Sequence, residues 1–255
     1  MIEDPFTDEF LEQEIEFYQP QAYEHDGLKI YMKPITGFTR LDEYFNKNLR
    51  TEGPTIPMLT MDGEIWMSLT WLEVQSLWAP ISRAWGRVGT AGLGMGYVAL
   101  RMAAKDEVTE VVVYESDPRV IKMFMDTQGH RPEVEKMKII EGDVYKLMVN
   151  QTFDFVLMDP YPTLLPDAVV EDIDFFLSQN DIREYRFWGQ EKVLLAAIND
   201  GLEIALDGAE GKLIAFWMES GKSSLYEHVY DREFVTNVID GLGRWRDQFE
   251  AEEEE

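Results

Sequence analysis

The spacing of apolar residues changes along the chain, and each change predicts a different kind of structure. Residues 1–20 carry apolar side chains loosely spaced as in a helix, set among acids. Residues 23–67 contain short apolar runs broken by turn residues, which is typical of strands. After Trp71 the apolar residues return to helical spacing, and this helix leads into Arg87. The first third of the chain is therefore expected to hold a helix, a small β-region and a second helix.

One hairpin is signalled directly within the β-region. Residues 58–61 and 64–68 are two apolar runs separated by Asp62 and Gly63. An Asp-Gly pair suits a type I′ turn, because both central residues of that turn need a positive φ. These two runs are expected to pair as antiparallel strands.

From Arg87 onward, strand-like and helix-like segments alternate. The uninterrupted runs Val111–Val113 and Phe155–Met158 are typical of parallel strands covered on both faces. Such alternation predicts an α/β fold with a doubly wound, mostly parallel sheet. The expected strands are 87–91, 110–115, 138–141, 153–158 and 212–218, and the expected helices are 96–104, 118–128, 144–149, 193–206 and 232–249.

These patterns divide the chain into three parts. Residues 1–70 form an acidic helix with a small β-hairpin region, residues 71–249 form a Rossmann-like domain, and residues 250–255 are an acidic tail. Residues 164–190 are long for a loop between a strand and its helix, so they are interpreted as an insertion. Its mixed acids and aromatics either enclose a cationic amine over the active site or only pack the insertion onto the domain.

Composition narrows the range of partners. The chain has 255 residues, 45% of them hydrophobic, and a formal net charge of −26. That charge argues against nucleic acids and anionic membranes and favours a cationic or neutral substrate. Cysteine is absent and the three histidines lack ligand spacing, so no metal site is expected. No signal peptide or membrane-spanning run is visible, so a cytoplasmic protein is expected.

The segment from Val88 to Tyr97 is the most informative part of the sequence. Gly92, Gly94 and Gly96 alternate with other residues between a predicted strand and a predicted helix. Glycines let a ligand approach the backbone of such a turn, and the amides of the following helix can then contact the ligand. The alternative is a tight strand-to-helix turn without a ligand.

Acids follow the glycine turn at informative places. Glu115 ends the next strand, nineteen residues after Gly96, where an acid pairs with ribose hydroxyls in sheets of this kind. Asp117 and Pro118 are expected to cap and begin a helix. Asp143 is expected either to accept a hydrogen bond from an adenine amino group or to cap the helix that begins at Val144.

A third acid, Asp159, ends the strand 153–158. It lies in the sequence Asp159-Pro160-Tyr161-Pro162, whose two prolines restrict the loop. The carboxyl ends of parallel strands form the rim where open α/β sheets bind ligands. Asp159 and Tyr161 are therefore candidate catalytic residues, and a role in the turn alone is the alternative.

In the order of these motifs, residues 87–218 resemble the class I S-adenosylmethionine-dependent methyltransferase superfamily. The resemblance implies that S-adenosylmethionine is the cofactor and that Asp159 faces the transferred group. Many members carry an acid where this chain has Thr90, two residues before Gly92. The implied cofactor-binding residues are Thr90, Gly92, Gly94 and Gly96 at the methionine part, Glu115 at the ribose, and Ser116, Asp143 and Val144 at the adenine.

A closer resemblance is to the spermidine synthase branch, the polyamine aminopropyltransferases. The hairpin sequence Met61-Asp62-Gly63-Glu64-Ile65 is similar to the hairpin of their small N-terminal β-domain, and Tyr114–Ile121 to their second-strand motif. Asp159 falls where their catalytic aspartate lies. Met95, however, stands where these enzymes place an aspartate that holds the amine of their cofactor. The resembled branch also implies a homodimer.

Together these observations favour an S-adenosylmethionine-dependent methyltransferase that acts on a small-molecule or protein acceptor, with a cationic amine as one candidate. In this hypothesis Asp159 deprotonates or orients the amine and Tyr161 positions it. Two alternatives stay open. One is a spermidine synthase-like aminopropyltransferase, and the other is a catalytically inactive binding protein with a methyltransferase fold.

Overall fold

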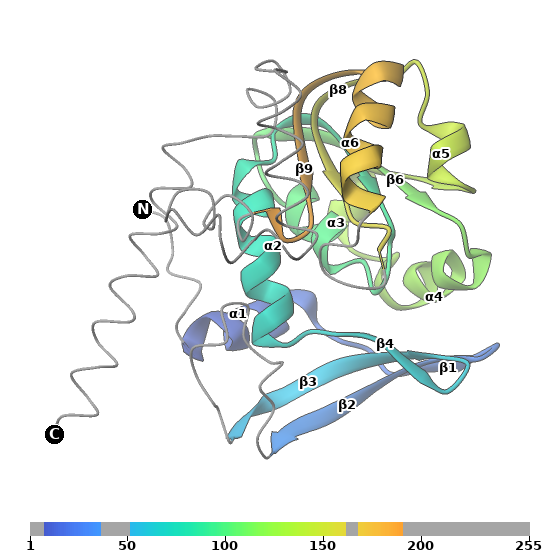
Figure 1. Cartoon of the computed structure of the whole chain (residues 1–255). Coiled ribbons are helices and arrows are strands. Elements are labelled where there is room, and N and C mark those ends of the chain that lie inside the picture. Colours follow the sequence, from blue (N-terminus) through green and yellow to red (C-terminus); the bar gives the residue numbers. More distant parts are fainter. Residues whose placement is uncertain (1–7, 37–51, 162–167, 191–255) are drawn as a thin grey trace, which may run out of the picture.

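A computed structural model describes residues 8–36, 52–161 and 168–190 (Figure 1). Within these residues the strands form two sheets, one of four strands and one of five. No helix in this part of the chain has both the length and the apolar character needed to cross a membrane. The predicted elements 193–206, 212–218 and 232–249, and the tail 250–255, lie outside the described residues.

The N-terminal part consists of helix α1 (Asp8–Tyr18) and a four-stranded antiparallel sheet. Its strands follow one another in space as along the chain: β1 (Tyr23–His25), β2 (Leu28–Thr36), β3 (Glu52–Met61) and β4 (Glu64–Ser68). The predicted hairpin is confirmed, since β3 pairs with β4 and φ is 52° at Asp62 and 91° at Gly63. Asp26 and Gly27 make a second turn with two positive φ angles between β1 and β2.

The second sheet is fully parallel, which confirms the predicted α/β fold. Its strands are β5 (Gly86–Ala91), β6 (Val108–Glu115), β7 (Met137–Glu141), β8 (Thr152–Met158) and β9 (Asp181–Phe187). They lie in the order β7-β6-β5-β8-β9, so the chain winds outward from β5 to β7 and then crosses to β8 and β9. The winding direction reverses between β5 and β8, where open sheets of this kind bind ligands.

Helices cover both faces of the parallel sheet (Figure 1). One core cluster joins residues of α2 (Trp71–Arg83), α3 (Tyr97–Ala103) and α4 (Pro118–Gln128) to one face. A second cluster joins residues of α5 (Val144–Leu147) and α6 (Ala168–Gln179) to the other face. A short 3-10 helix, η1 (Pro132–Lys136), precedes β7. Val111 and Val113 of β6 point to the first cluster and Val112 to the second, which explains its uninterrupted apolar run.

The interpretation of residues 164–190 as an insertion is wrong where the structure describes them. Residues 168–179 form α6, and residues 181–187 form β9, which pairs in parallel with β8. Helix α6 buries Val169, Ile173 and Phe176, which have helical spacing. Acids interrupt this stripe, and β9 follows α6 after one residue, so the sequence shows no clear boundary between helix and strand.

The buried carboxylate of Glu14 joins helix α1 to helix α3, which packs on the parallel sheet. Glu14, only 4% exposed, accepts hydrogen bonds from the Tyr97 hydroxyl at 2.7 Å and from the Arg101 guanidinium at 2.5 Å. The Tyr18 hydroxyl donates to the carbonyl oxygen of Met95 at 2.9 Å. The N-terminal segment is therefore bound to α3 and to the glycine turn that precedes it.

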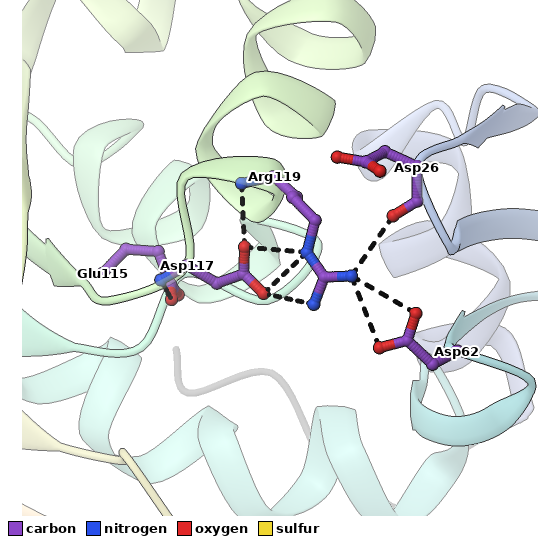
Figure 2. Close-up of polar contacts among 5 residues, drawn as sticks. All are labelled: Asp26, Asp62, Glu115, Asp117 and Arg119. Atoms are coloured by element: carbon purple, nitrogen blue, oxygen red, sulfur yellow. Dashed lines mark hydrogen bonds and ion pairs between the residues drawn. The ribbon is translucent and has the colours of Figure 1, made fainter.

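Arg119 joins the small sheet to the start of α4 (Figure 2). Its guanidinium donates to the Asp117 carboxylate at 2.7 Å, to the Asp62 carboxylate at 3.3 Å and to the Asp26 carbonyl oxygen at 3.2 Å. Asp117 also accepts the amide of Arg119, as expected of a helix cap before Pro118. These hydrogen bonds from Arg119 hold the pKa of Asp117 below its ordinary value.

Two glycine substitutions should separate steric cost from backbone strain. Gly96 has a φ of 85°, and an added Cβ would lie 2.2 Å from the Phe124 ring, whereas Gly63 at φ 91° has open space around it. We expect Gly63→Ala to cost about 1–2 kcal/mol of unfolding free energy. Gly96→Ala should cost about 1–3 kcal/mol more, because Phe124 must move. Urea unfolding measures both, and equal losses would contradict the packing of Gly96 against α4.

Candidate functional site

The glycine turn between β5 and α3 has left-handed backbone at all three glycines. The φ angles are 83° at Gly92, 51° at Gly94 and 85° at Gly96, a conformation that other residues adopt only with strain. A Cβ on Gly92 would lie 2.8 Å from the carbonyl oxygen of Asp159. The turn therefore lies directly against the end of β8, and only a residue without a side chain fits there.

Most amides of this turn already have acceptors within the protein. The Gly92 amide donates to the Tyr114 carbonyl, the Gly96 amide to the Leu93 carbonyl, and the Met95 amide to the Met67 sulfur at 3.2 Å. Gly94 is the residue of the turn whose amide has no acceptor in the described part of the chain. A ligand at this turn would thus meet the amide of Gly94 and not a row of free amides.

Glu115, only 9% exposed, holds the turn in place from the end of β6. One carboxylate oxygen accepts the Leu93 amide at 2.9 Å. The other accepts the Asp117 amide at 2.8 Å, as Figure 2 shows. Each carboxylate oxygen can accept a further hydrogen bond. A pair of neighbouring hydroxyls, such as those of a ribose, needs such a pair of acceptors, so Glu115 suits the predicted role. Ser116 follows it and is exposed.

Asp143 caps α5, which was one of its two expected roles. Its carboxylate accepts the Tyr145 amide at 3.0 Å and pairs with the Lys146 ammonium at 3.0 Å. The contact with Lys146 lowers the pKa of Asp143 most, so the group is ionised at neutral pH. Val144 is the first residue of α5 and is buried in the core. Contact of Asp143 and Val144 with an adenine ring stays a prediction.

Thr90 and Met95, which depart from the resembled families, both have buried side chains. Thr90 is 1% exposed, and its hydroxyl has no hydrogen-bond partner among the residues that the structure describes. Met95 is also 1% exposed and belongs to the core cluster on the α2 side of the sheet. Met95 is therefore a core residue. The hydroxyl of Thr90 is a buried polar group without a hydrogen-bond partner among the described residues.

Asp159 follows β8 directly and has a carboxyl neighbour that the sequence analysis did not identify. Burial raises the pKa of Asp159 well above its ordinary value, and the carboxylate of Glu73 raises it further. Burial also raises the pKa of Glu73 from 4.5 to about 7. Neither carboxyl group has a hydrogen-bond or ion-pair partner in the part of the chain that the structure describes. The sequence signal for Glu73 is that it is a single acid between Leu72 and Val74 in a mostly apolar helix.

Tyr161 is bound to α6 by a buried aspartate. Its hydroxyl donates to a carboxylate oxygen of Asp172 at 2.6 Å, and the Tyr145 hydroxyl donates to the same oxygen at 2.8 Å. Asp172 is 6% exposed, and burial raises the pKa of Tyr161 far above its ordinary value. This contact joins Tyr161 to α6, and positioning of a substrate by Tyr161 stays a prediction.

The topology brings three of the predicted residues to one edge of the sheet. Ala91 at the end of β5 pairs with Tyr114 of β6 on one side and with Met158 of β8 on the other. Directly after Ala91, Tyr114 and Met158 in the sequence come Gly92, Glu115 and Asp159, respectively. The glycine turn, Glu115 and Asp159 therefore lie at the same edge of the sheet, where its winding direction reverses.

No family model matches this sequence, and no curated protein matches it. Solved structures with a similar fold include a probable spermidine synthase from Corynebacterium glutamicum. That likeness has 15% identity and a TM-score of 0.41, and it covers 61% of this chain and 57% of that one. Another is TrmK of M. capricolum in complex with S-adenosylhomocysteine, at 9% identity, a TM-score of 0.37, and coverage of 47% and 55%.

A third is the YcgJ protein of Bacillus subtilis, with 20% identity, a TM-score of 0.35, and coverage of 44% of this chain and 48% of that one. The chain spans about half the length of the solved structures it matches. Each of these likenesses concerns the fold of part of the chain.

Proposed function

We propose that this protein is an S-adenosylmethionine-dependent methyltransferase that acts on a small-molecule or protein acceptor bearing a cationic amine. One observation carries the proposal. The left-handed glycine turn lies between the carboxylate of Glu115 and the backbone of Asp159 at the point where the winding of the sheet reverses. Nucleotide-type ligands bind open α/β sheets at this place.

The residues at this edge suit the proposed cofactor. Glu115 keeps one free acceptor position on each oxygen for the two ribose hydroxyls. The glycine turn, in which the Gly94 amide has no acceptor among the described residues, would lie along the methionine part. Ser116, Asp143 and Val144 would lie toward the adenine. When bound, S-adenosylmethionine supplies a methyl group on a positively charged sulfur, which a nucleophile can accept without a covalent enzyme intermediate.

Asp159 would act on the acceptor amine. A carboxyl group with a raised pKa can take a proton from an ammonium group more readily than an ordinary carboxylate. The Tyr161–Asp172 hydrogen bond holds Tyr161 two residues after Asp159, which would help to keep the backbone at Asp159 in one position. The net charge of −26 further favours a cationic acceptor.

Aminopropyl transfer is the second candidate. The four-stranded N-terminal sheet with its Asp62-Gly63 turn favours it, since the resembled polyamine enzymes carry such a hairpin domain. Against it, Met95 is a core residue and offers no carboxylate to an amine. A preference for decarboxylated S-adenosylmethionine over S-adenosylmethionine in calorimetric titration would favour this candidate.

Two isosteric substitutions should affect cofactor binding and turnover differently. We expect Glu115→Gln to weaken binding of S-adenosylhomocysteine roughly 10- to 100-fold, because the amide loses one acceptor and the charge. Asp159→Asn should lower turnover by roughly 100- to 10,000-fold and cofactor affinity by about tenfold at most. Titration calorimetry of the full chain measures affinity, and release of S-adenosylhomocysteine with a panel of amines measures turnover.

Glu135→Gln is the matched control, because Glu135 is exposed on η1, which leads into the opposite end of the parallel strands. Glu135→Gln should change neither the cofactor affinity nor the turnover. Absence of any binding of S-adenosylmethionine and S-adenosylhomocysteine to the wild-type protein would refute the proposed function. Equal losses of affinity and turnover in Asp159→Asn would refute the proposed role of Asp159.

The raised pKa of Glu73 makes stability depend on pH. Between the ordinary value of 4.5 and about 7, the folded state binds more protons at Glu73 than the unfolded state does. The free energy of unfolding therefore falls as pH rises through this window. We expect Glu73→Gln to gain about 1–3 kcal/mol on the wild type between pH 5 and pH 8. Urea unfolding at both pH values measures this gain, and a constant difference would contradict the burial of Glu73.

A further inference from the structure

Helix α6 carries a buried carboxylate that joins two separate segments of the chain. The hydroxyls of Tyr145 in α5 and Tyr161 after β8 both donate to the same oxygen of Asp172, at 2.8 Å and 2.6 Å. Asp172 is 6% exposed, and no cation pairs with it among the residues that the structure describes. Hydrogen bonds to a carboxylate are stronger than those between neutral groups, so both hydroxyls are held firmly on this oxygen.

The two tyrosines belong to segments with different predicted roles. The amide of Tyr145 donates to Asp143, which is predicted to lie near the adenine of the cofactor. Tyr161 comes two residues after Asp159, which is predicted to act on the acceptor. Asp172 therefore connects the cofactor side of the proposed site with its acceptor side, through contacts that do not pass through the parallel sheet.

Helix α5 depends on α6 for its position. With four residues, α5 is too short to be stable without tertiary contacts. Near its start, the Tyr145 ring packs on the fully buried Phe176 of α6, with ring centroids 5.3 Å apart. After its end, the carbonyl oxygen of Met148 accepts the side-chain amide of Asn180 at 3.0 Å, directly after α6. Loss of one of these contacts is therefore expected to shift α5.

The two hydroxyls depend on each other because they share one buried acceptor. Tyr145 is 39% exposed and Tyr161 is half-buried, whereas Asp172 is buried. A buried carboxylate that loses one donor is left with too few hydrogen bonds, which is unfavourable. Release of either hydroxyl is therefore expected to move the carboxylate and to weaken its contact with the other tyrosine.

We propose that Asp172 is a positioning residue that couples binding of the cofactor's nucleoside part to the loop after β8. The proposal rests on the proposed function and adds a connection between the two halves of that site. Contact of the adenine with the start of α5 holds the Tyr145 hydroxyl on Asp172, and Asp172 then holds Tyr161. Because coupling between two sites is reciprocal, the Tyr161 hydroxyl contributes to nucleoside affinity without touching the nucleoside.

Calorimetric titration of the full chain with two probes tests this coupling. The probes are S-adenosylhomocysteine and 5′-methylthioadenosine, which has the same nucleoside without the amino acid part. We expect Tyr161→Phe to weaken binding of both by the same factor, roughly 3- to 30-fold, because the effect enters through the nucleoside. Asp172→Asn should weaken both at least as much, since the amide removes the charge from both hydrogen bonds.

A double-mutant cycle separates this coupling from direct contact of Tyr161 with the ligand. Once Tyr145→Phe has broken the connection, adding Tyr161→Phe should change either affinity by no more than about twofold. Full additivity of the two substitutions would overturn the proposal. Tyr185→Phe is the matched control, because Tyr185 is fully buried and its hydroxyl has no hydrogen-bond partner among the described residues. It should leave both affinities unchanged, and a loss equal to that of Tyr161→Phe would also overturn the proposal.

Circular dichroism verifies that each variant folds, and the tyrosine variants decide if Asp172→Asn does not. Unchanged affinities of Tyr161→Phe, in a protein whose wild type binds both probes, would overturn the coupling and leave the proposed function intact. A loss for S-adenosylhomocysteine alone would overturn it too, because the effect would then enter through the amino acid part. Failure of the wild type to bind either probe would refute the proposed function, and the coupling with it.

Discussion

The candidate site depends on the close approach of Gly92 to the backbone at Asp159. A Cβ at Gly92 would lie 2.8 Å from the Asp159 carbonyl oxygen, so no other residue allows this approach. Glu115 then holds the turn from the other side by accepting the Leu93 amide. The ends of β5, β6 and β8 are fixed relative to one another by these contacts, and every proposed role follows from that arrangement.

The small antiparallel sheet is connected to this arrangement through a series of polar contacts. Glu115 accepts the Asp117 amide, Asp117 pairs with Arg119, and Arg119 reaches Asp62 and the carbonyl of Asp26 in the two hairpin turns (Figure 2). Met67 of β4 accepts the amide of Met95 in the glycine turn. The N-terminal part thus supports the shape of the turn, in addition to packing beside it.

Most charged side chains near the parallel sheet have partners, which makes the partnerless acids informative. Glu14, Asp117 and Glu184 each accept hydrogen bonds from an arginine. Glu73 and Asp159 have raised pKa values, the charge of Glu73 contributes to that of Asp159, and neither carboxyl group has such a partner among the described residues. A buried group kept in an unfavourable state is a frequent feature of binding and catalytic sites, because a ligand can relieve it.

The sequence by itself determined the local elements whose signals lie within a few residues. Asp62-Gly63 predicted a hairpin, Asp117-Pro118 a helix start, and the apolar run Val111–Val113 a strand buried on both faces, because turn chemistry, capping and burial act locally. It also placed Gly92, Glu115 and Asp159 at strand ends. Their convergence followed only from the strand order, which the expected doubly wound fold implies and the structure specifies.

Contacts between residues distant in sequence were decided by the tertiary structure alone. Nothing around Glu73 indicates that its charge acts on Asp159, and the pairing of Tyr161 with Asp172 was hidden in a segment interpreted as an insertion. Acids interrupt the apolar stripe of α6, so hydrophobic spacing did not reveal the helix, although burial of Val169, Ile173 and Phe176 stabilises it. Local patterns define elements, whereas the packing of those elements against one another decides which side chains meet.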